Sequence, residues 1–125
     1  AAAEPRLAAC VCSGYFNQRT NKLVVPSEHY TAYIRTDEHD KFLLNQLNEF
    51  SDSDIASLIC PRPFFVEAGA RDPVIWLPDA QEEFAKIREI YEKLGIPERV
   101  EMEVFEGDHR INADGALRFL DRWLM

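Results

Sequence analysis

Strand-like and helix-like patterns alternate twice between residues 64 and 124, and this alternation limits the folds open to the chain. "FFVEAG" (64–69) is rich in strand-forming residues, and apolar residues then recur at helical spacing from Pro78 to Leu94. "VEMEVFEG" (100–107) alternates apolar and acidic residues, as a strand near a sheet edge does, and "ADGALRFLDRWLM" (113–125) is again helical. This order is typical of a parallel sheet with crossover helices, so we predict an α/β fold.

One more strand is predicted near the start of the chain. The apolar run from Leu7 to Val11 is closed by Ser13 and Gly14, which suits a strand buried on both faces that ends in a turn. With only about three parallel strands, the first strand is predicted to keep an unpaired edge, which invites pairing with another segment. The expected architecture is a three-layer α/β/α arrangement in a single domain, 1–125.

The predicted domain has three parts: a strand and turn (1–16), an irregular or helical excursion (17–50), and a βαβα unit (51–125). "FLLNQLNEF" (42–50) suggests a brief helix at the end of the excursion. Ser51, Asp52 or Ser53 is predicted to cap the next short helix, which the "PRP" at 61–63 stops. Arg62, between the two prolines, is predicted to anchor nearby carbonyl groups.

Charge and composition exclude several classes of protein. The 14 Lys and Arg against 22 Asp and Glu give a net charge of -8, without the concentrated basic face that binds nucleic acid. No apolar run approaches the ~20 residues of a membrane span. The Ala-rich start also lacks the charged and hydrophobic regions of a signal peptide. We therefore expect a cytoplasmic protein that binds neither nucleic acid nor a membrane and needs no cofactor.

The three cysteines, Cys10, Cys12 and Cys60, have no zinc or redox spacing. Because an odd number cannot all pair within one chain, reduced and mostly buried thiols are predicted.

Four possible metal ligands lie in the excursion: His29, Asp37, His39 and Asp40. Their side chains are suitable ligands, but their spacing fits no regular helical or hairpin site. A solvated loop without metal is therefore predicted for this stretch.

Two polar residues follow predicted strands. Asp72 comes three residues after Gly69, at the end of the second strand, and His109 follows Gly107 at the end of the third. Active residues of open parallel sheets gather past the carboxyl ends of strands that lie about 4.8 Å apart, so the two side chains are predicted to come within reach of each other. Such an acid fixes the imidazole tautomer and leaves the other ring nitrogen for a nucleophile. Glu67, inside the second strand, is predicted to face inward or to cap the pocket beside these two residues.

Taken singly, Asp72 before a proline and His109 in a loop are routine turn residues. Their order carries more information, because an acid followed by one helix and a histidine is the order of hydrolases that place the nucleophile earlier.

Four short motifs accompany this pair in a fixed order: "LICPRP" before a strand, "GARDP" with the acid, "YEKLG" at a helix end and "FEGDH" with the histidine. Together they resemble the carboxy-terminal half of the α/β-hydrolase fold, in its dienelactone-hydrolase-like and acetyl-xylan-esterase-like branch. The resemblance runs from about Asp54 to Leu124, and "RLAACVCSGYF" (6–16) is similar to the family strand that follows the nucleophile helix. It implies a carboxylic-ester hydrolase.

By this resemblance, Asp72 is the acid and His109 the general base of a Ser-His-Asp triad. The nucleophile does not carry over, because the family's G-x-S-x-G elbow lies upstream of the strand that resembles residues 7–12. The oxyanion donors are missing with it. Asp108 stands where the family usually has a second glycine or a small residue.

Cys12 is a weaker substitute for the missing nucleophile. It ends a strand, but an elbow needs a helix directly after it, and "YFNQRTNKLVVP" (15–26) is a poor helix start. A buried strand cysteine is the competing interpretation. Ser13 is interpreted as a turn residue or a wall of the site.

The sequence thus predicts a chain that supplies the acid and the base for hydrolysis of a small ester through an acyl-enzyme, and that is inactive or nearly so alone. Its expected partner is a missing amino-terminal half. The alternative is a non-catalytic hydrolase-derived remnant that self-associates, as a two-fold dimer that covers the edge of the first strand.

Overall fold

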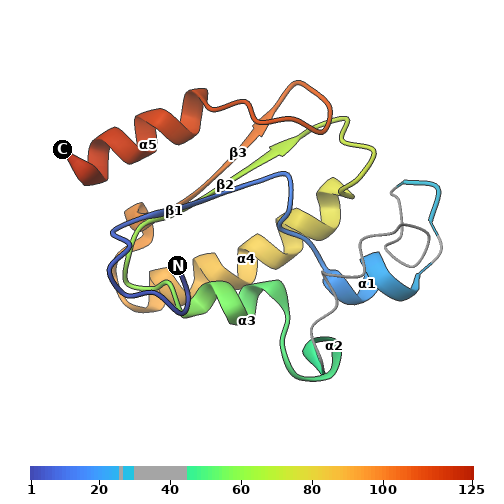
Figure 1. The fold of residues 1–125 in the computed structure, drawn as a ribbon, viewed down its shortest axis with the longest axis horizontal. Helices are drawn as coiled ribbons and strands as arrows, with labels where there is room; N and C mark the ends of the chain where they lie inside the picture. Colours follow the sequence, from blue (N-terminus) through green and yellow to red (C-terminus); the bar gives the residue numbers. More distant parts are fainter. Residues whose placement is uncertain (26, 30–44) are drawn as a thin grey trace.

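The computed structural model describes residues 1–25, 27–29 and 45–125. Its strands are β1 (Cys10–Ser13), β2 (Phe64–Gly69) and β3 (Val100–Phe105). Its helices are α1 (Arg19–Val24), α2 (Gln46–Glu49), α3 (Asp52–Ser57), α4 (Leu77–Lys93), the 3-10 turn η3 (Pro97–Arg99) and α5 (Asp114–Leu124). The parallel sheet, in the order β1-β2-β3, lies between α5 on one face and α3 and α4 on the other (Figure 1). The predicted three-layer α/β fold is confirmed.

The central strand, β2, is buried along its whole length. Its side chains alternate between the two faces of the sheet, as in any strand. Phe64 and Val66 pack in a cluster with residues of α4, whereas Phe65 packs on Phe119 of α5 at 5.2 Å between ring centroids. The apolar run that predicted a strand therefore contributes to two cores.

The first strand is shorter and more exposed to solvent than predicted. It begins at Cys10 rather than Leu7, and its residues are only half-buried. Among the described residues β1 pairs with β2 alone, so its other edge has no neighbour to cover it. The predicted burial on both faces is wrong, because the residues of β1 are only half-buried, and among the described residues the other edge of β1 is unpaired.

The packing face of the last helix matches the prediction only in part: of the expected Leu117, Leu120, Trp123 and Leu124, Trp123 packs against the buried cluster of Phe65, Ala116 and Phe119. The buried residues of α5 are Gly115, Ala116 and Phe119, and both Leu117 and Leu124 are exposed. A Cβ on Gly115 would lie 2.5 Å from the carboxylate of Glu103, so the absence of a side chain there lets α5 approach β3 closely. The packing face of α5 therefore combines the small residues Gly115 and Ala116 with the aromatic Phe119.

Arg62 anchors the start of the chain, as predicted. Its guanidinium donates hydrogen bonds of 2.9–3.3 Å to the carbonyl oxygens of Ala1, Glu4, Leu7, Leu58 and Ile59. The rigid fork of donors suits several carbonyl groups at once. The predicted cap of α3 is also present, since Ser51 forms a capping box with Asp54.

The excursion between residues 17 and 50, predicted to be irregular or helical, contains α1, whose position the sequence did not predict. α1 has no side-chain hydrogen bond at its amino-terminal cap. Tertiary contacts hold it instead: Arg19 forms a buried ion pair with Asp52, at 2.8 Å between Nε and Oδ1, and Lys22 is also buried. Such short helices depend on packing rather than on propensity. The expected apolar residues Phe42 and Leu43 lie outside the described residues.

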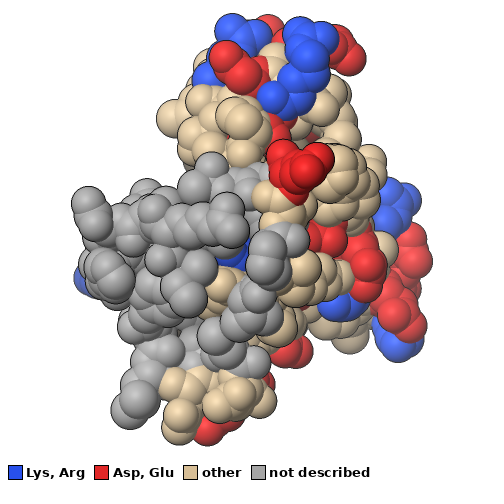
Figure 2. Space-filling model, turned by 90° about the vertical axis from the view of Figure 1, so that its right-hand side faces the viewer, with Lys and Arg blue, Asp and Glu red and all other residues tan. Residues whose placement is uncertain are grey.

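Figure 2 views the molecule from the side toward which the strands run, and acidic and basic side chains lie next to one another on the described surface there. Cys10, Cys12 and Cys60 are unpaired, and each is half-buried rather than mostly buried as predicted. Within the described ranges, none of the helices has the length and apolar character needed to cross a membrane.

Candidate active site

The predicted acid and histidine lie together at the carboxyl edge of the sheet. Asp72 follows β2, His109 follows β3, and Nδ1 of His109 lies 2.9 Å from Oδ2 of Asp72. Because β2 and β3 are parallel neighbours in register, both loops start at the same edge. The topology therefore joins two residues that are 37 positions apart in the sequence.

The carboxylate of Asp72 is held at both oxygens. Oδ1 accepts hydrogen bonds from the backbone N–H groups of Val74, at 2.7 Å, and Ile75, at 3.1 Å. The side chain is 1% exposed, so these donors take the place of water. Aspartate commonly bonds to its own backbone two residues onward, which explains why Asp before Pro suits this turn. Oδ2 is thereby turned toward the imidazole.

The hydrogen bond to Asp72 leaves the other ring nitrogen of His109 without a partner among the described residues. An ionised carboxylate only accepts hydrogen bonds, so Nδ1 of His109 carries the ring proton and donates a hydrogen bond to Asp72. The side chain is 47% exposed, and Nε2 forms no hydrogen bond with any described residue. A neutral imidazole in this tautomer can accept a proton at Nε2, and the buried carboxylate stabilises the imidazolium that results.

The loops that carry the two residues are joined by their backbones. The N–H of Ala70 donates to the carbonyl of Phe105 at 2.9 Å, and that of Arg71 donates to Gly107 at 2.8 Å. The side chain of Asp108, the residue that departs from the family pattern, is exposed. The side chain of Asp108 therefore extends into solvent rather than into the loop contacts.

Gly14 lies against both members of the pair. A Cβ at this position would lie 3.3 Å from Nδ1 and Cε1 of His109 and 3.7 Å from Oδ2 of Asp72. Its φ of +58° also favours glycine. The sequence indicated only a turn here, although a glycine directly after a strand that ends at the same edge was a usable signal.

Two further residues support the site, and one of them was missed. Lys22 of α1 is buried and its Nζ donates to the carbonyl of Val74, the same residue whose N–H bonds to Asp72. Glu67 faces inward, the first of its two predicted orientations, and is fully buried. The signal for Glu67 was a charged residue within an otherwise apolar strand.

Cys12 is poorly suited to act as the nucleophile. It packs against the apolar cluster between the sheet and α4, and burial raises the pKa of its thiol to about 12. Reactive cysteines need the opposite shift, toward the thiolate. No helix directly follows it, since α1 begins only at Arg19. Ser13, the other residue considered, is the last residue of β1 and pairs with Glu67.

The described structure does not bring the possible metal ligands of the excursion together. His29 stacks on Trp76 with ring centroids 3.9 Å apart, and Asp37, His39 and Asp40 lie outside the described residues. In the part of the chain that the structure describes, no group of three or more His, Cys, Asp or Glu side chains could hold a metal ion.

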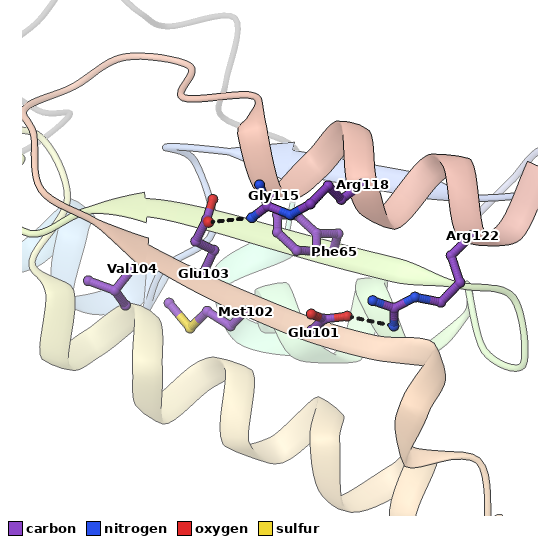
Figure 3. Close-up of a pocket in the computed structure, with 8 residues that line it drawn as sticks. All are labelled: Phe65, Glu101, Met102, Glu103, Val104, Gly115, Arg118 and Arg122. Atoms are coloured by element: carbon purple, nitrogen blue, oxygen red, sulfur yellow. Dashed lines mark hydrogen bonds and ion pairs between the residues drawn. The ribbon is translucent and has the colours of Figure 1, made fainter.

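A separate cavity of about 330 Å³ lies between β3 and α5 (Figure 3). Two ion pairs cross it, from Arg118 to Glu103 at 3.4 Å and from Arg122 to Glu101 at 3.1 Å. Neither Asp72 nor His109 lines this cavity. It therefore lies apart from the paired acid and imidazole.

Several solved esterase structures have a similar fold. A carbohydrate esterase family 15 glucuronoyl esterase from Caldicellulosiruptor kristjansonii matches with a TM-score of 0.70 and 18% identity, over 96% of this chain and 37% of that one. An esterase from Pyrococcus furiosus matches with a TM-score of 0.57 and 16% identity, over 99% and 48%. A methylesterase matches with a TM-score of 0.50 and 20% identity, over 60% and 17%.

No family model and no curated protein sequence matches this chain. The chain has the fold of a part of these esterases and spans less than half the length of each.

Proposed function

We propose that this chain supplies the acid and the general base of a carboxylic-ester hydrolase. The observation that carries the proposal is the hydrogen bond of 2.9 Å between Nδ1 of His109 and the buried carboxylate of Asp72. Both residues lie on loops past the carboxyl ends of adjacent parallel strands, where open α/β sheets place their reactive groups. The esterase fold of the similar structures supports the same reaction class.

In the proposed reaction, Nε2 of His109 takes the proton of a serine hydroxyl while the serine oxygen attacks the carbonyl carbon of the ester. The imidazolium then gives this proton to the departing alcohol oxygen, and an acyl-enzyme remains. Water attacks the acyl carbon after losing a proton to Nε2, and that proton returns to the serine as the acid leaves. Asp72 keeps its negative charge throughout and holds the ring in the reactive tautomer.

We further propose that the serine and the oxyanion donors come from polypeptide outside this chain, as the resemblance to the carboxy-terminal half of dienelactone-hydrolase-like enzymes implies. The sequence has no G-x-S-x-G motif. In the part of the chain that the structure describes, β1 has an open edge for a further strand beside Gly14, where an added Cβ would lie 3.3 Å from His109 and 3.7 Å from Asp72. A strand joined there would end next to the free nitrogen of the imidazole.

The proposal is tested by measuring nitrophenyl-acetate hydrolysis by this chain alone and together with a polypeptide that carries the serine elbow of the same enzyme. We expect little or no turnover alone and robust turnover in the complex. His109→Ala and Asp72→Asn should each abolish most of the gain, whereas Asp108→Ala, on the same loop but exposed, should retain it. Robust turnover by the chain alone that survives serine- and cysteine-directed inactivators would contradict the proposal.

The open edge of β1 also supports a second candidate function, a self-associating domain without catalysis. Its half-buried residues and unpaired backbone are suited to pairing with a second copy across a two-fold axis. Light scattering after size-exclusion chromatography separates the two proposals. A stable dimer that remains inactive when the polypeptide with the serine elbow is added favours this second function. A monomer argues against it.

A further inference from the structure

The carboxylate of Glu67 lies beneath the segment that follows His109. Glu67 is 0% exposed, and its Oε1 and Oε2 accept hydrogen bonds from the backbone N–H groups of Asn112 and Ala113, each at 3.1 Å. No Lys or Arg among the described residues forms an ion pair with it. A buried charge is costly unless it is hydrogen-bonded, so these two amides are the groups that compensate it.

The backbone of the loop is shaped to present both amides to this one carboxylate. Ala113 has a φ of +68°, in the left-handed region that an alanine rarely adopts. Successive N–H groups in such a conformation can turn toward the same side and form a concave anion site. Here the anion is a side chain of β2. The unfavourable conformation and the buried charge therefore support each other.

The histidine loop is thereby fixed at both ends to β2 and the loop after it. Before His109, the carbonyl of Gly107 accepts a hydrogen bond from Arg71. After His109, Asn112 and Ala113 bind Glu67. The segment formed by β2 and the loop after it carries Glu67 and also Asp72, five positions later. Residues 67–72 therefore carry the acid and also bind both ends of the histidine loop, so this short stretch of backbone determines the distance between the imidazole and the acid.

We propose that Glu67 is a positioning residue for His109. By holding the second end of the loop, it keeps Nδ1 of His109 within hydrogen-bond distance of Asp72 and so maintains the tautomer that leaves Nε2 free. This inference rests on the proposed role of His109 as the base and adds a buried carboxylate that does not touch the reacting atoms.

A matched control exists on the other face of the sheet. Glu83 of α4 is 1% exposed and its Oε1 accepts a backbone hydrogen bond from Ser53 at 2.8 Å, but it belongs to the packing of α3 on α4. Glu67→Gln and Glu83→Gln each replace one buried carboxylate that accepts hydrogen bonds from the backbone, two at Glu67 and one at Glu83, which also forms an ion pair with Lys86 at 2.7 Å. A purely structural role predicts similar effects of both changes on the stability of the fold and no selective effect on His109.

The readout is the pair of side-chain ¹⁵N chemical shifts of His109, followed with the amide exchange of Asn112 and Ala113. In the unaltered chain we expect the Nδ1–H tautomer of neutral His109. Glu67→Gln places an amide N–H₂ against a backbone N–H. It should accelerate exchange at Asn112 and Ala113 about tenfold or more and shift His109 toward the mixed tautomers of an unconstrained imidazole. Glu83→Gln should leave both signals unchanged.

The outcomes separate this inference from the proposed function. An unaltered chain in which His109 carries its proton on Nε2 contradicts the role of the histidine as base. An Nδ1–H signal that persists in folded Glu67→Gln overturns the positioning role alone. If Glu67→Gln does not fold, the unaltered chain is followed in sub-denaturing urea. There the loss of amide protection at Asn112 and Ala113 must accompany the loss of the His109 Nδ1–H signal, and independent losses overturn the inference.

Discussion

Gly69 and Asp108 are in backbone contact: a Cβ on Gly69 would lie 2.3 Å from the carbonyl oxygen of Asp108 and 2.8 Å from that of Gly107. The histidine loop thus rests directly on the end of β2. No side chain separates the loop that carries the acid from the one that carries the histidine. Gly69, the glycine after "FFVEA", is required by this close approach. It is not required by its backbone conformation, because its φ is not in the left-handed region.

Gly69→Ala should therefore move the histidine loop. Backbone carbonyls cannot retreat as a flexible side chain can, so we expect a loss of about 1–3 kcal/mol in the free energy of unfolding and a displaced His109 signal in ¹⁵N spectra. Gly95→Ala is the control, because its φ of +71° is unfavourable for alanine but nothing lies within 4 Å of the added Cβ. That change should cost about 1–2 kcal/mol without altering His109. Equal spectra for the two variants would contradict the contact.

Asp72→Asn should reverse the protonation of His109 while leaving the turn intact. The amide oxygen can still accept from Val74 and Ile75, but an N–H₂ group facing the ring favours an unprotonated Nδ1. We expect ¹⁵N shifts of the Nε2–H tautomer. In the complete hydrolase, kcat should fall by roughly 10⁴, the size of this effect in serine-protease triads. An unchanged Nδ1–H signal would show that Asp72 does not control the ring.

The order of elements and the central pair could be predicted because both depend on local patterns. Helical spacing fixed α4, and strand-forming residues fixed β2. Asp72 and His109 could be paired because parallel strands end at the same edge, a rule that needs no knowledge of loop conformation.

The remaining parts depend on tertiary contacts that no local pattern contains. α1 lacks a capping side chain and is held by the buried pair of Arg19 with Asp52, 33 positions away. The hydrogen bond that the N–H of Ala113 donates to Glu67 is made from a left-handed conformation, which alanine disfavours. Such conflicts between local preference and structure are expected where a site is positioned.

Gly14→Ala tests whether the end of β1 limits the space around the pair. The φ of +58° alone should cost about 1–2 kcal/mol of stability, and the methyl group would press on a ring whose atoms lie 3.3 Å away. We expect weaker hydrogen bonding of His109 to Asp72, seen as a shift of the Nδ1 resonance. If Gly14→Ala perturbs His109 no more than Gly95→Ala does, Gly14 is only a turn residue.

Cys12 should react slowly with iodoacetamide at neutral pH. Burial raises the pKa of its thiol to about 12, so the thiolate is scarce below that pH. Mass-spectrometric mapping should show labelling of Cys12 far slower than that of an unstructured cysteine peptide, and His109→Ala should not change the rate. Fast labelling that His109→Ala suppresses would instead support Cys12 as a nucleophile paired with His109. The raised pKa also affects the free energy of unfolding. The folded state keeps the thiol proton to a higher pH than the unfolded state, so stability falls as the pH rises above the pKa of the unfolded thiol.

Ala113→Gly should stabilise the chain, although most glycine substitutions do not. The left-handed φ of +68° costs an alanine about 1–2 kcal/mol, and glycine is also preferred over alanine at the amino-terminal cap of α5. The greater freedom of the unfolded chain offsets about 0.4–1 kcal/mol, which leaves a net gain of about 0.5–1 kcal/mol in urea unfolding. Ala116→Gly, the same change inside α5, should lose about 1 kcal/mol. If both changes destabilise alike, Ala113 does not hold the conformation that turns its N–H toward Glu67.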